Sequence, residues 1–184
     1  GSNEIISALF GYGSFSEEAV KNSANALYFF SFGLPAFALI KVFSTFFFAN
    51  NDTKTPFYIS LFSVILNIFV SLYYFKSIGF IIIPIATTIS SWINSIVLFF
   101  FLRKRNLFEF NKVFPTRFLK TVLVSIIMGV FFKYLILIFE NHMVYDNSFK
   151  SFYLILSILL CLAFYLLASY FIKAFNYKDL QLKY

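Results

Sequence analysis

The sequence predicts an all-α bundle of helices that cross a membrane several times. Of its 184 residues, 60% are hydrophobic and only 12% are charged, which is about half the charged share of an ordinary soluble domain. The mean hydropathy is +0.82, and a water-soluble fold would have to expose most of the 30 Phe residues. The apolar residues also form runs close to the roughly 20 residues that a helix needs to cross hydrocarbon.

Five apolar runs are long enough to be transmembrane spans. We predict helices because lipid cannot satisfy free backbone N–H and C=O groups, so each span must pair them internally. A β-barrel is disfavoured, since the runs lack strict alternation and are about twice as long as barrel strands. The five predicted spans are residues 24–49, 57–75, 80–102, 118–139 and 152–175.

Breakers and polar residues mark a kink and the connections. Gly33-Leu34-Pro35 predicts a kink inside the first span, because proline has no N–H to donate to the preceding turn. Residues 50–56 form a polar connection that ends in Thr55-Pro56, a pair suited to the start of a helix. The other predicted connections are a tight turn at residues 76–79 and loops at residues 103–116 and 140–150.

The basic residues predict the orientation. The net charge of +7 does not indicate nucleic-acid binding, because the basic residues lie between apolar runs and not among exposed aromatics on a polar face. They are instead biased to one side of the spans, which we predict to be cytoplasmic together with the C-terminus. The acidic segment 1–21 then lies outside without a signal sequence, so we expect preceding spans and interpret the chain as part of a longer protein. The richer side holds Lys54, Arg103, Lys104, Arg105, Lys112, Arg117, Lys120, Lys173, Lys178 and Lys183, against Lys21, Lys76, Lys133 and Lys150.

Polar side chains inside the spans form two stripes, which a short turn brings face to face. One reading is hydrogen bonding between packed helices; the other is a polar cavity that takes a cation or a substrate. Lys41 allows the same pair of readings, because its long side chain either reaches the interface or lines a cavity. The stripes are Ser60, Ser63, Asn67 and Ser71 in residues 57–75, and Thr87, Ser91, Asn94 and Ser95 in residues 80–102.

No set of residues predicts catalysis. Cys161 and His142 are single, and there is no nucleophile–base pair, pair of carboxylates or histidine cluster in or beside the spans. We therefore predict that the protein is not an enzyme and that these residues imply no cofactor. The spans 118–139 and 152–175 carry few polar side chains, which is typical of helices that face lipid or shape an apolar groove.

Three segments resemble a known family. Residues 33–42 (GLPAFALIKV) and 48–56 (FANNDTKTP) are similar to segments of the MurJ/MviN family of bacterial lipid II flippases, and Leu9 to Phe15 resembles the segment that precedes them there. Asn67, Gly79 and Arg103-Lys104 also fall where that family has them. The likeness is clear over about residues 8–105, and beyond Asn106 it depends on the number of helices and their apolar character.

The resemblance implies an architecture. The family has fourteen helices and belongs to the multidrug/oligosaccharidyl-lipid/polysaccharide exporter superfamily, so the chain would hold helices ten to fourteen. Residues 1–23 would be an external loop or short helix, and residues 24–105 a three-helix part of the C-terminal lobe. Residues 106–184 would be two additional C-terminal helices and a cytoplasmic tail.

The resemblance also implies a function. We expect part of a flippase that moves undecaprenyl-linked peptidoglycan precursor across the inner membrane by alternating access, with the last two helices forming a groove for the polyprenyl tail. Its partners would be membrane lipid, that precursor and the N-terminal part of the same protein. The alternatives are an exporter of another polyprenyl-linked saccharide and a small non-transporting scaffold or assembly protein.

The site residues implied are of two kinds. Some family members bind sodium, and the matching ligands here would be Asn67, Thr87 and the carbonyl of Ile83, with Ser71 where an acidic ligand stands. No other cofactor is implied. The candidate residues for the substrate cavity are Lys41, Asn67, Ser71, Thr87, Ser91 and Asn94.

Overall fold

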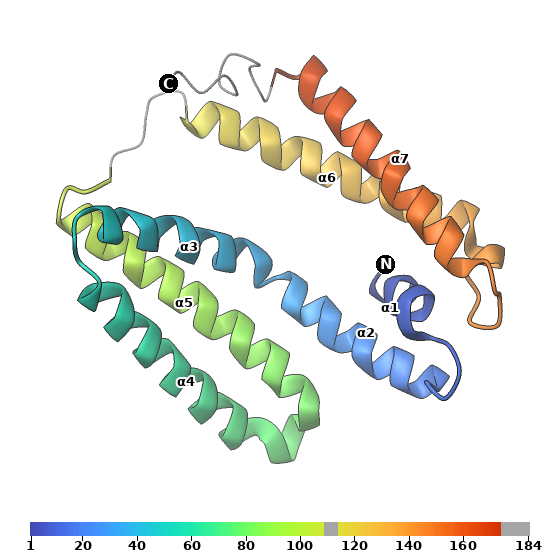
Figure 1. The fold of residues 1–184 in the computed structure, drawn as a ribbon, viewed down its shortest axis with the longest axis horizontal. Helices are drawn as coiled ribbons and strands as arrows, with labels where there is room; N and C mark the ends of the chain where they lie inside the picture. The colour runs from blue at the N-terminus through green and yellow to red at the C-terminus, as the bar shows by residue number, and fades with distance from the viewer. Residues whose placement is uncertain (109–113, 174–184) are drawn as a thin grey trace. The chain divides into compact units, whose positions relative to one another are not determined.

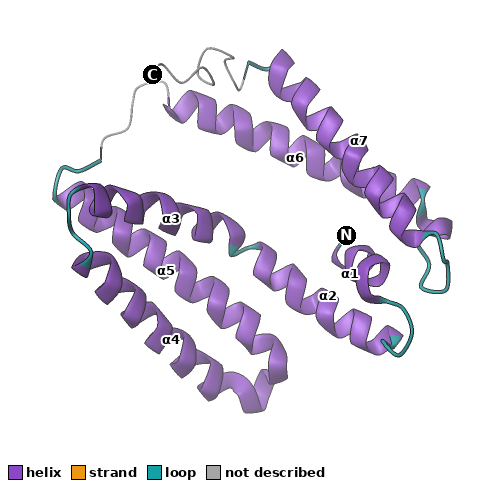
Figure 2. Cartoon of the chain, viewed as in Figure 1, coloured by secondary structure: helices purple, strands orange, loops and turns teal. Residues whose placement is uncertain are grey.

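The computed structural model describes residues 1–108 and 114–173, and every regular element in them is a helix (Figure 2). This confirms the prediction of an all-α membrane helix bundle. The α-helices are α1 (Ser2–Phe10), α2 (Glu17–Ser31), α3 (Leu34–Ala49), α4 (Lys54–Ile78), α5 (Ile82–Lys104), α6 (Phe114–Ile138) and α7 (Lys150–Phe171), with 3₁₀ turns at Gly79–Ile81 and Glu140–His142 (Figure 1).

The apolar helices account for three or four spans by length and composition. Three stretches qualify, Lys54–Lys104, Phe114–Ile138 and Lys150–Phe171, and the bent pair α2–α3 makes a fourth if it is one span. The first stretch contains α4 and α5, which fold back on each other at Gly79, where φ is +73° (Figure 1). The predicted number of five spans counts α4 and α5 separately, and it stays a prediction. The end of the predicted span 152–175 lies outside the described residues.

The chain divides into two compact units, residues 1–21 with 110–184 and residues 22–109. The first five residues of α2 belong to the former unit and the rest of α2 to the latter. The predicted division into a short external segment, a lobe part and two extra helices stays a prediction, although α2 already begins at Glu17, within the segment predicted as a loop or short helix.

In the unit of residues 22–109, α5 is the central helix. It packs along both α3 and α4, whereas α3 and α4 scarcely touch each other. Small side chains on α5 allow this, since Ala86, Ser90, Ser91 and Ser95 are all buried. Toward the α3–α4 loop, larger apolar side chains form a buried cluster of Phe43, Phe47, Ile59, Leu98 and Leu102.

The predicted kink is a full break between α2 and α3, bent by 42°. Pro35 lies in the first turn of α3 and has no N–H. At the break Gly33 N–H donates to the carbonyl of Phe30 and not to that of Phe29, and two backbone carbonyls there accept from side chains of α5. Thr88 Oγ1 donates to the carbonyl of Phe29 (2.9 Å), and Trp92 Nε1 donates to the carbonyl of Phe32 (2.9 Å). Since lipid would leave such carbonyls unpaired, α5 stabilises the bent conformation.

Gly33 permits this close packing. A Cβ at Gly33 would lie 3.1 Å from Thr88 Oγ1 and 3.2 Å from the carbonyl of Phe30, which is tighter than ordinary van der Waals contact. Gly33 of the GLPAF segment therefore also allows α5 to approach the break closely. The sequence predicts its place at a kink but not this contact.

The α3–α4 loop is held by an ion pair to the end of α5. Asp52 accepts from both the backbone N–H (3.0 Å) and the hydroxyl (2.7 Å) of Thr55 at the start of α4. The guanidinium of Arg105 pairs with the same carboxylate and donates to Thr55 Oγ1 (3.1 Å). The hydrogen bonds from the Thr55 side chain and backbone, and to a lesser extent the Arg105 pair, lower the pKa of Asp52 from its usual 3.8 to about 2, while desolvation opposes them.

In the unit of residues 1–21 and 110–184, α6 and α7 pack together and α1 lies against α7. The rings of Phe131 and Phe164 stack between the two long helices, with centroids 4.5 Å apart. Lys150, the last residue of the loop predicted at residues 140–150, is instead the first residue of α7 and is only 1% exposed.

We expect Thr88→Val to lower the free energy of unfolding of the full-length protein by about 1 kcal/mol, because the Phe29 carbonyl loses its partner inside the membrane. Reversible unfolding in mixed micelles measures this. Thr45→Val is the matched control, since Thr45 Oγ1 donates only within its own helix, to the carbonyl of Lys41. Equal effects of the two variants would contradict the role assigned to the break.

The Asp52 ion pair predicts a pH dependence of stability. Because the pKa of Asp52 is lower in the folded state, its contribution is complete above about pH 4 and is lost as the pH falls toward 2. Thermal unfolding in detergent from pH 6 to pH 2 should show the melting temperatures of the parent and of Asp52→Asn converging across that window. A constant difference between the two would refute this assignment.

Candidate functional site

A polar groove lies over α5 between α3 and α4. It encloses about 390 Å³, and both predicted polar stripes contribute to it. Its polar lining is Ser60, Ser63, Asn67, Thr87, Ser90, Ser91 and Asn94, and its apolar lining is Phe37, Ile40, Val64 and Ile68.

Asn67 is the centre of the hydrogen bonds between α4 and α5. Its amide nitrogen donates to Thr87 Oγ1 (2.9 Å) and to Ser90 Oγ (3.3 Å). Thr87 Oγ1 in turn donates to the carbonyl of Ile83 (2.8 Å), one turn earlier on α5. Ser71 Oγ donates to Asn67 Oδ1 (3.5 Å) from the same helix. The structure therefore brings all three expected sodium ligands, with Ser71, into one connected set.

The hydroxyl groups of the groove have acceptor capacity to spare. Ser63 donates to the carbonyl of Ile59 (3.0 Å), and both Ser90 (3.0 Å) and Ser91 (2.7 Å) donate to the carbonyl of Thr87. Each hydroxyl has one hydrogen and two lone pairs, so its donor is used within its own helix. The hydroxyl groups of this partly apolar groove therefore offer mainly lone pairs, which suits a ligand that donates hydrogen bonds or carries positive charge.

Asn94 adds a buried acceptor to this surplus. Its amide nitrogen donates weakly to Ser60 Oγ (3.4 Å), while Oδ1 finds no hydrogen-bond partner among the described residues. The residue is 6% exposed, and an unpaired buried carbonyl costs about 1–3 kcal/mol. A donor supplied from elsewhere would remove this cost.

The expected site residues are thus partly brought together. Asn67, Thr87, Ser91 and Asn94 line the groove. Lys41 does not line it and is exposed; its backbone carbonyl accepts from Thr45 Oγ1 (2.9 Å). Sequence reasoning missed Ser90, although its spacing of three residues from Thr87 places it on the same face of the helix.

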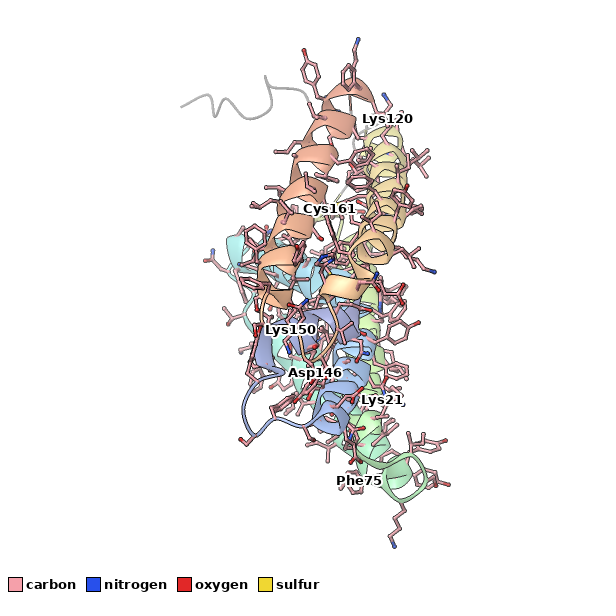
Figure 3. All side chains as sticks on the ribbon, turned by 90° about the vertical axis from the view of Figure 1, so that its right-hand side faces the viewer. Lys21, Phe75, Lys120, Asp146, Lys150 and Cys161 are labelled. Atoms are coloured by element: carbon pink, nitrogen blue, oxygen red, sulfur yellow. The ribbon has the colours of Figure 1, made fainter. Side chains whose placement is uncertain are left out.

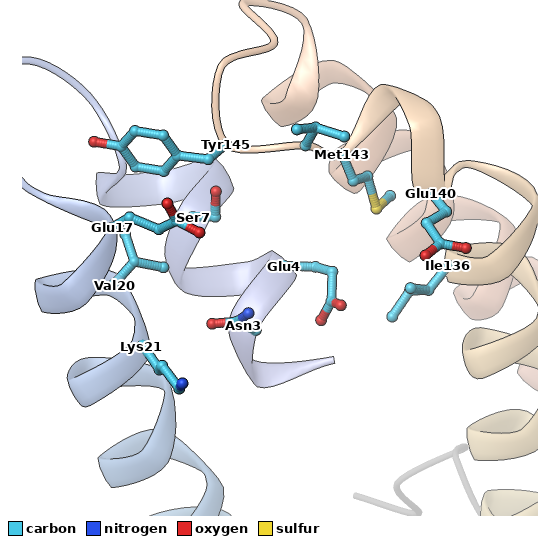
Figure 4. Close-up of a pocket in the computed structure, with 11 residues that line it drawn as sticks. Asn3, Glu4, Ser7, Glu17, Val20, Lys21, Ile136, Glu140, Met143 and Tyr145 are labelled. Atoms are coloured by element: carbon cyan, nitrogen blue, oxygen red, sulfur yellow. The ribbon is translucent and has the colours of Figure 1, made fainter.

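An acidic pocket of about 240 Å³ lies in the other unit, between α1, the start of α2 and the end of α6 (Figure 4). The carboxylates of Glu4, Glu17 and Glu140 line it, together with the amine of Lys21. No group of three or more His, Cys, Asp or Glu side chains in the described part of the chain is placed to hold a metal ion. The pocket is therefore not assigned as a metal centre.

The comparison with known families decides the identity of this bundle. A family model described as "Lipid II flippase MurJ" matches residues 1–156. The chain belongs to the MurJ family. The match extends some 50 residues beyond the segments that carry the resemblance in the sequence, through α6 and into the first turns of α7.

Curated relatives agree with the MurJ family model. A protein named "Probable lipid II flippase MurJ" from Rickettsia prowazekii is 31% identical over 97% of this chain, which corresponds to 35% of that relative. Proteins of the same name from Thermotoga maritima (36% identical, 70% of this chain, 25% of the relative) and Rhizobium meliloti (38%, 53% and 18%) also match. The chain thus spans about a third or less of the length of these MurJ relatives.

Proposed function

We propose that this chain is part of a lipid II flippase, which moves undecaprenyl-linked peptidoglycan precursor across the bacterial inner membrane by alternating access. The observation that carries this proposal is the match of the MurJ family model to residues 1–156. Transport of this kind makes and breaks no covalent bond in the lipid, so the protein would not be an enzyme. The rest of the full-length protein and membrane lipid would be its partners.

The helix arrangement supports a transporter. Broken helices with polar residues beside them are a recurring feature of transporter binding regions, and the α2–α3 break lies next to α5, which carries half of the polar groove. The groove residues and Lys41 are our candidates for the substrate or ion pathway. We also propose that α6 and α7 present the apolar surface for the polyprenyl tail, since Ile126, Val130 and Leu159 are all more than half exposed and lie within apolar helices.

We further propose the orientation with the C-terminus in the cytoplasm and five spans. Arg103 and Lys104 at the end of α5 are exposed, as is Lys54 at the start of α4, so the same end of this helix pair carries the positive charge that favours the cytoplasmic side.

The alternatives are not favoured. The fold would also suit an exporter of another polyprenyl-linked saccharide or a non-transporting scaffold. However, the family model and these curated relatives are all named for lipid II flippases.

The full-length protein that contains this chain should replace the lipid II flippase of a bacterium depleted of its own. We expect growth to be restored, and lipid II to become cleavable by a degrading enzyme added outside the cells, because the headgroup reaches the outer leaflet. A variant in which Gly33 is replaced by Leu is the internal comparison, since its side chain would clash at the α2–α3 break. Accumulation of the protein in the membrane without outward movement of lipid II would refute the proposal.

As a second proposal, the Asn67–Thr87 set holds a sodium ion in the full-length protein. Thr87 Oγ1 lies within 2.9 Å of the Asn67 amide and 2.8 Å of the Ile83 carbonyl, and turning the Asn67 amide by 180° would present its oxygen to the same point. Oxygen ligands of this kind suit a hard cation. The described groove supplies neutral oxygens only, so any negative charge at the ion would come from another part of the protein.

Sodium should therefore raise the melting temperature of the full-length protein more than potassium at equal ionic strength, because it binds the folded state. We expect Asn67→Leu and Thr87→Val to abolish the difference between the two salts, and Thr45→Val to preserve it. If the parent protein responds equally to both salts, the polar stripes serve helix packing alone and the sodium proposal fails.

A further inference from the structure

Lys150 is a buried cation held by the backbone and by aromatic rings. Its ammonium donates to the carbonyl of Gly11 (2.6 Å) and to the carbonyl of Tyr145 (2.5 Å). It also lies 4.3 Å from the ring centroid of Tyr12 and 4.6 Å from that of Tyr145. Figure 3 shows Lys150 where the first turn of α7 meets the N-terminal segment.

The charge of Lys150 is balanced without an acid. No carboxylate among the residues that the structure describes lies within ion-pair distance of its ammonium. Asp146 lines the same small pocket as Lys150 but forms no ion pair with it among the described residues. Burial of an unbalanced ammonium is strongly unfavourable, and the two carbonyl dipoles and the two ring faces offset that cost. The four groups form a cage that matches a small cation with several N–H donors.

The cage is built from two distant parts of the chain. Gly11 and Tyr12 follow α1, whereas Tyr145 and Lys150 precede or begin α7, and their contacts join positions up to 139 residues apart. Gly11 must lack a side chain, because a Cβ there would lie 2.6 Å from the carbonyl of Ser7 and 3.2 Å from the Lys150 ammonium. The contacts with Lys150 thus explain Gly11 and Tyr12 in the segment Leu9 to Phe15. The proposed transport function does not involve these two residues.

Neighbouring hydrogen bonds join the same two parts. Ser151 Oγ donates to the carbonyl of Ala8 (2.5 Å), and the hydroxyl of Tyr12 therefore donates to Ser151 Oγ (2.6 Å). The hydroxyl of Tyr145 donates to the carbonyl of Phe15 (2.5 Å). These bonds lie around the ammonium, so its loss would leave the buried carbonyl of Gly11 and the partly buried carbonyl of Tyr145 without their donor.

We propose that Lys150 is an ammonium latch, a positioning residue that holds the segment from Ser7 to Phe15 on the first turn of α7. The latch fixes one end of the α6–α7 pair to the residues that precede α2. The cage selects the ammonium group itself, not the volume of the lysine stem. This proposal stands apart from the transport function, because it concerns only contacts within one compact unit.

The latch can be tested by chemical rescue. The reporter is Ala8→Cys in the full-length protein with its other cysteines replaced, because Ala8 is 2% exposed beside Ser151 and a maleimide reaches it only when the segment leaves α7. In this background Lys150→Ala should raise the labelling rate at least about tenfold, since two charge-assisted hydrogen bonds are lost. n-Propylammonium, which supplies the deleted atoms, should return the rate toward that of the parent, whereas 1-propanol should not.

Two further variants separate charge from packing. Lys150→Met keeps the length of the stem without the charge, so we expect it to label as fast as Lys150→Ala and to be insensitive to n-propylammonium. Lys133→Ala removes an exposed lysine of α6 and should label at the parent rate. If Lys150→Ala does not accumulate, the labelling of Lys150→Met alone decides the question.

Three results would overturn the proposal. A parent-like labelling rate of Lys150→Met would show that the stem, and not the ammonium, holds the segment. Rescue of Lys150→Ala by 1-propanol as well as by n-propylammonium would show a cavity that any filler satisfies. Parent-like labelling of Lys150→Ala would show that the contact does not depend on Lys150.

Discussion

Hydrocarbon offers no hydrogen-bond partners, and this constraint decides how the helices of this chain are joined. Where a helix is regular, each backbone group is paired within it. Where α2 ends and α3 begins, the carbonyls of Phe29 and Phe32 need partners from another helix, and Thr88 and Trp92 of α5 supply them. The break is thus a stable feature of the bundle, because α5 supplies hydrogen-bond donors to carbonyls at the break.

The same constraint governs the side chains of the groove. A serine or threonine hydroxyl in a membrane helix donates most readily to a carbonyl one turn earlier, and Ser63, Thr87 and Ser91 all do so. Their donors are then used locally while their lone pairs stay available. Helix packing alone uses few of those lone pairs, so they would be available to the cation that we propose at this site.

The sequence predicts the features that depend on local pattern, such as the kink at Gly33 to Pro35 and the polar stripes of α4 and α5, which a short turn forces together. It does not predict contacts made by the far parts of the chain. No sequence pattern indicates that Trp92 Nε1 donates to the carbonyl of Phe32. The sequence places Lys150 at the end of a loop and does not predict its burial. The burial depends on Gly11 and Tyr12, which are far away in sequence. Long-range pairing of this kind leaves no periodic signal.

The groove and the latch present the same chemistry in complementary states. Around Lys150, carbonyl oxygens and rings enclose an ammonium that the chain itself provides. Around Asn67 and Asn94, oxygens converge but the described residues bring no cation to them, since Lys41 lies outside the groove. The chain covers about a third of its MurJ relatives, so under the proposed function these oxygens would be paired by a bound cation, by a donor group of the ligand or by a side chain from the rest of the protein. A site that binds and releases a ligand needs acceptors that the ligand itself pairs. The carbonyls around Lys150 are already paired by a side chain of the same protein, so they serve to hold the fold in place.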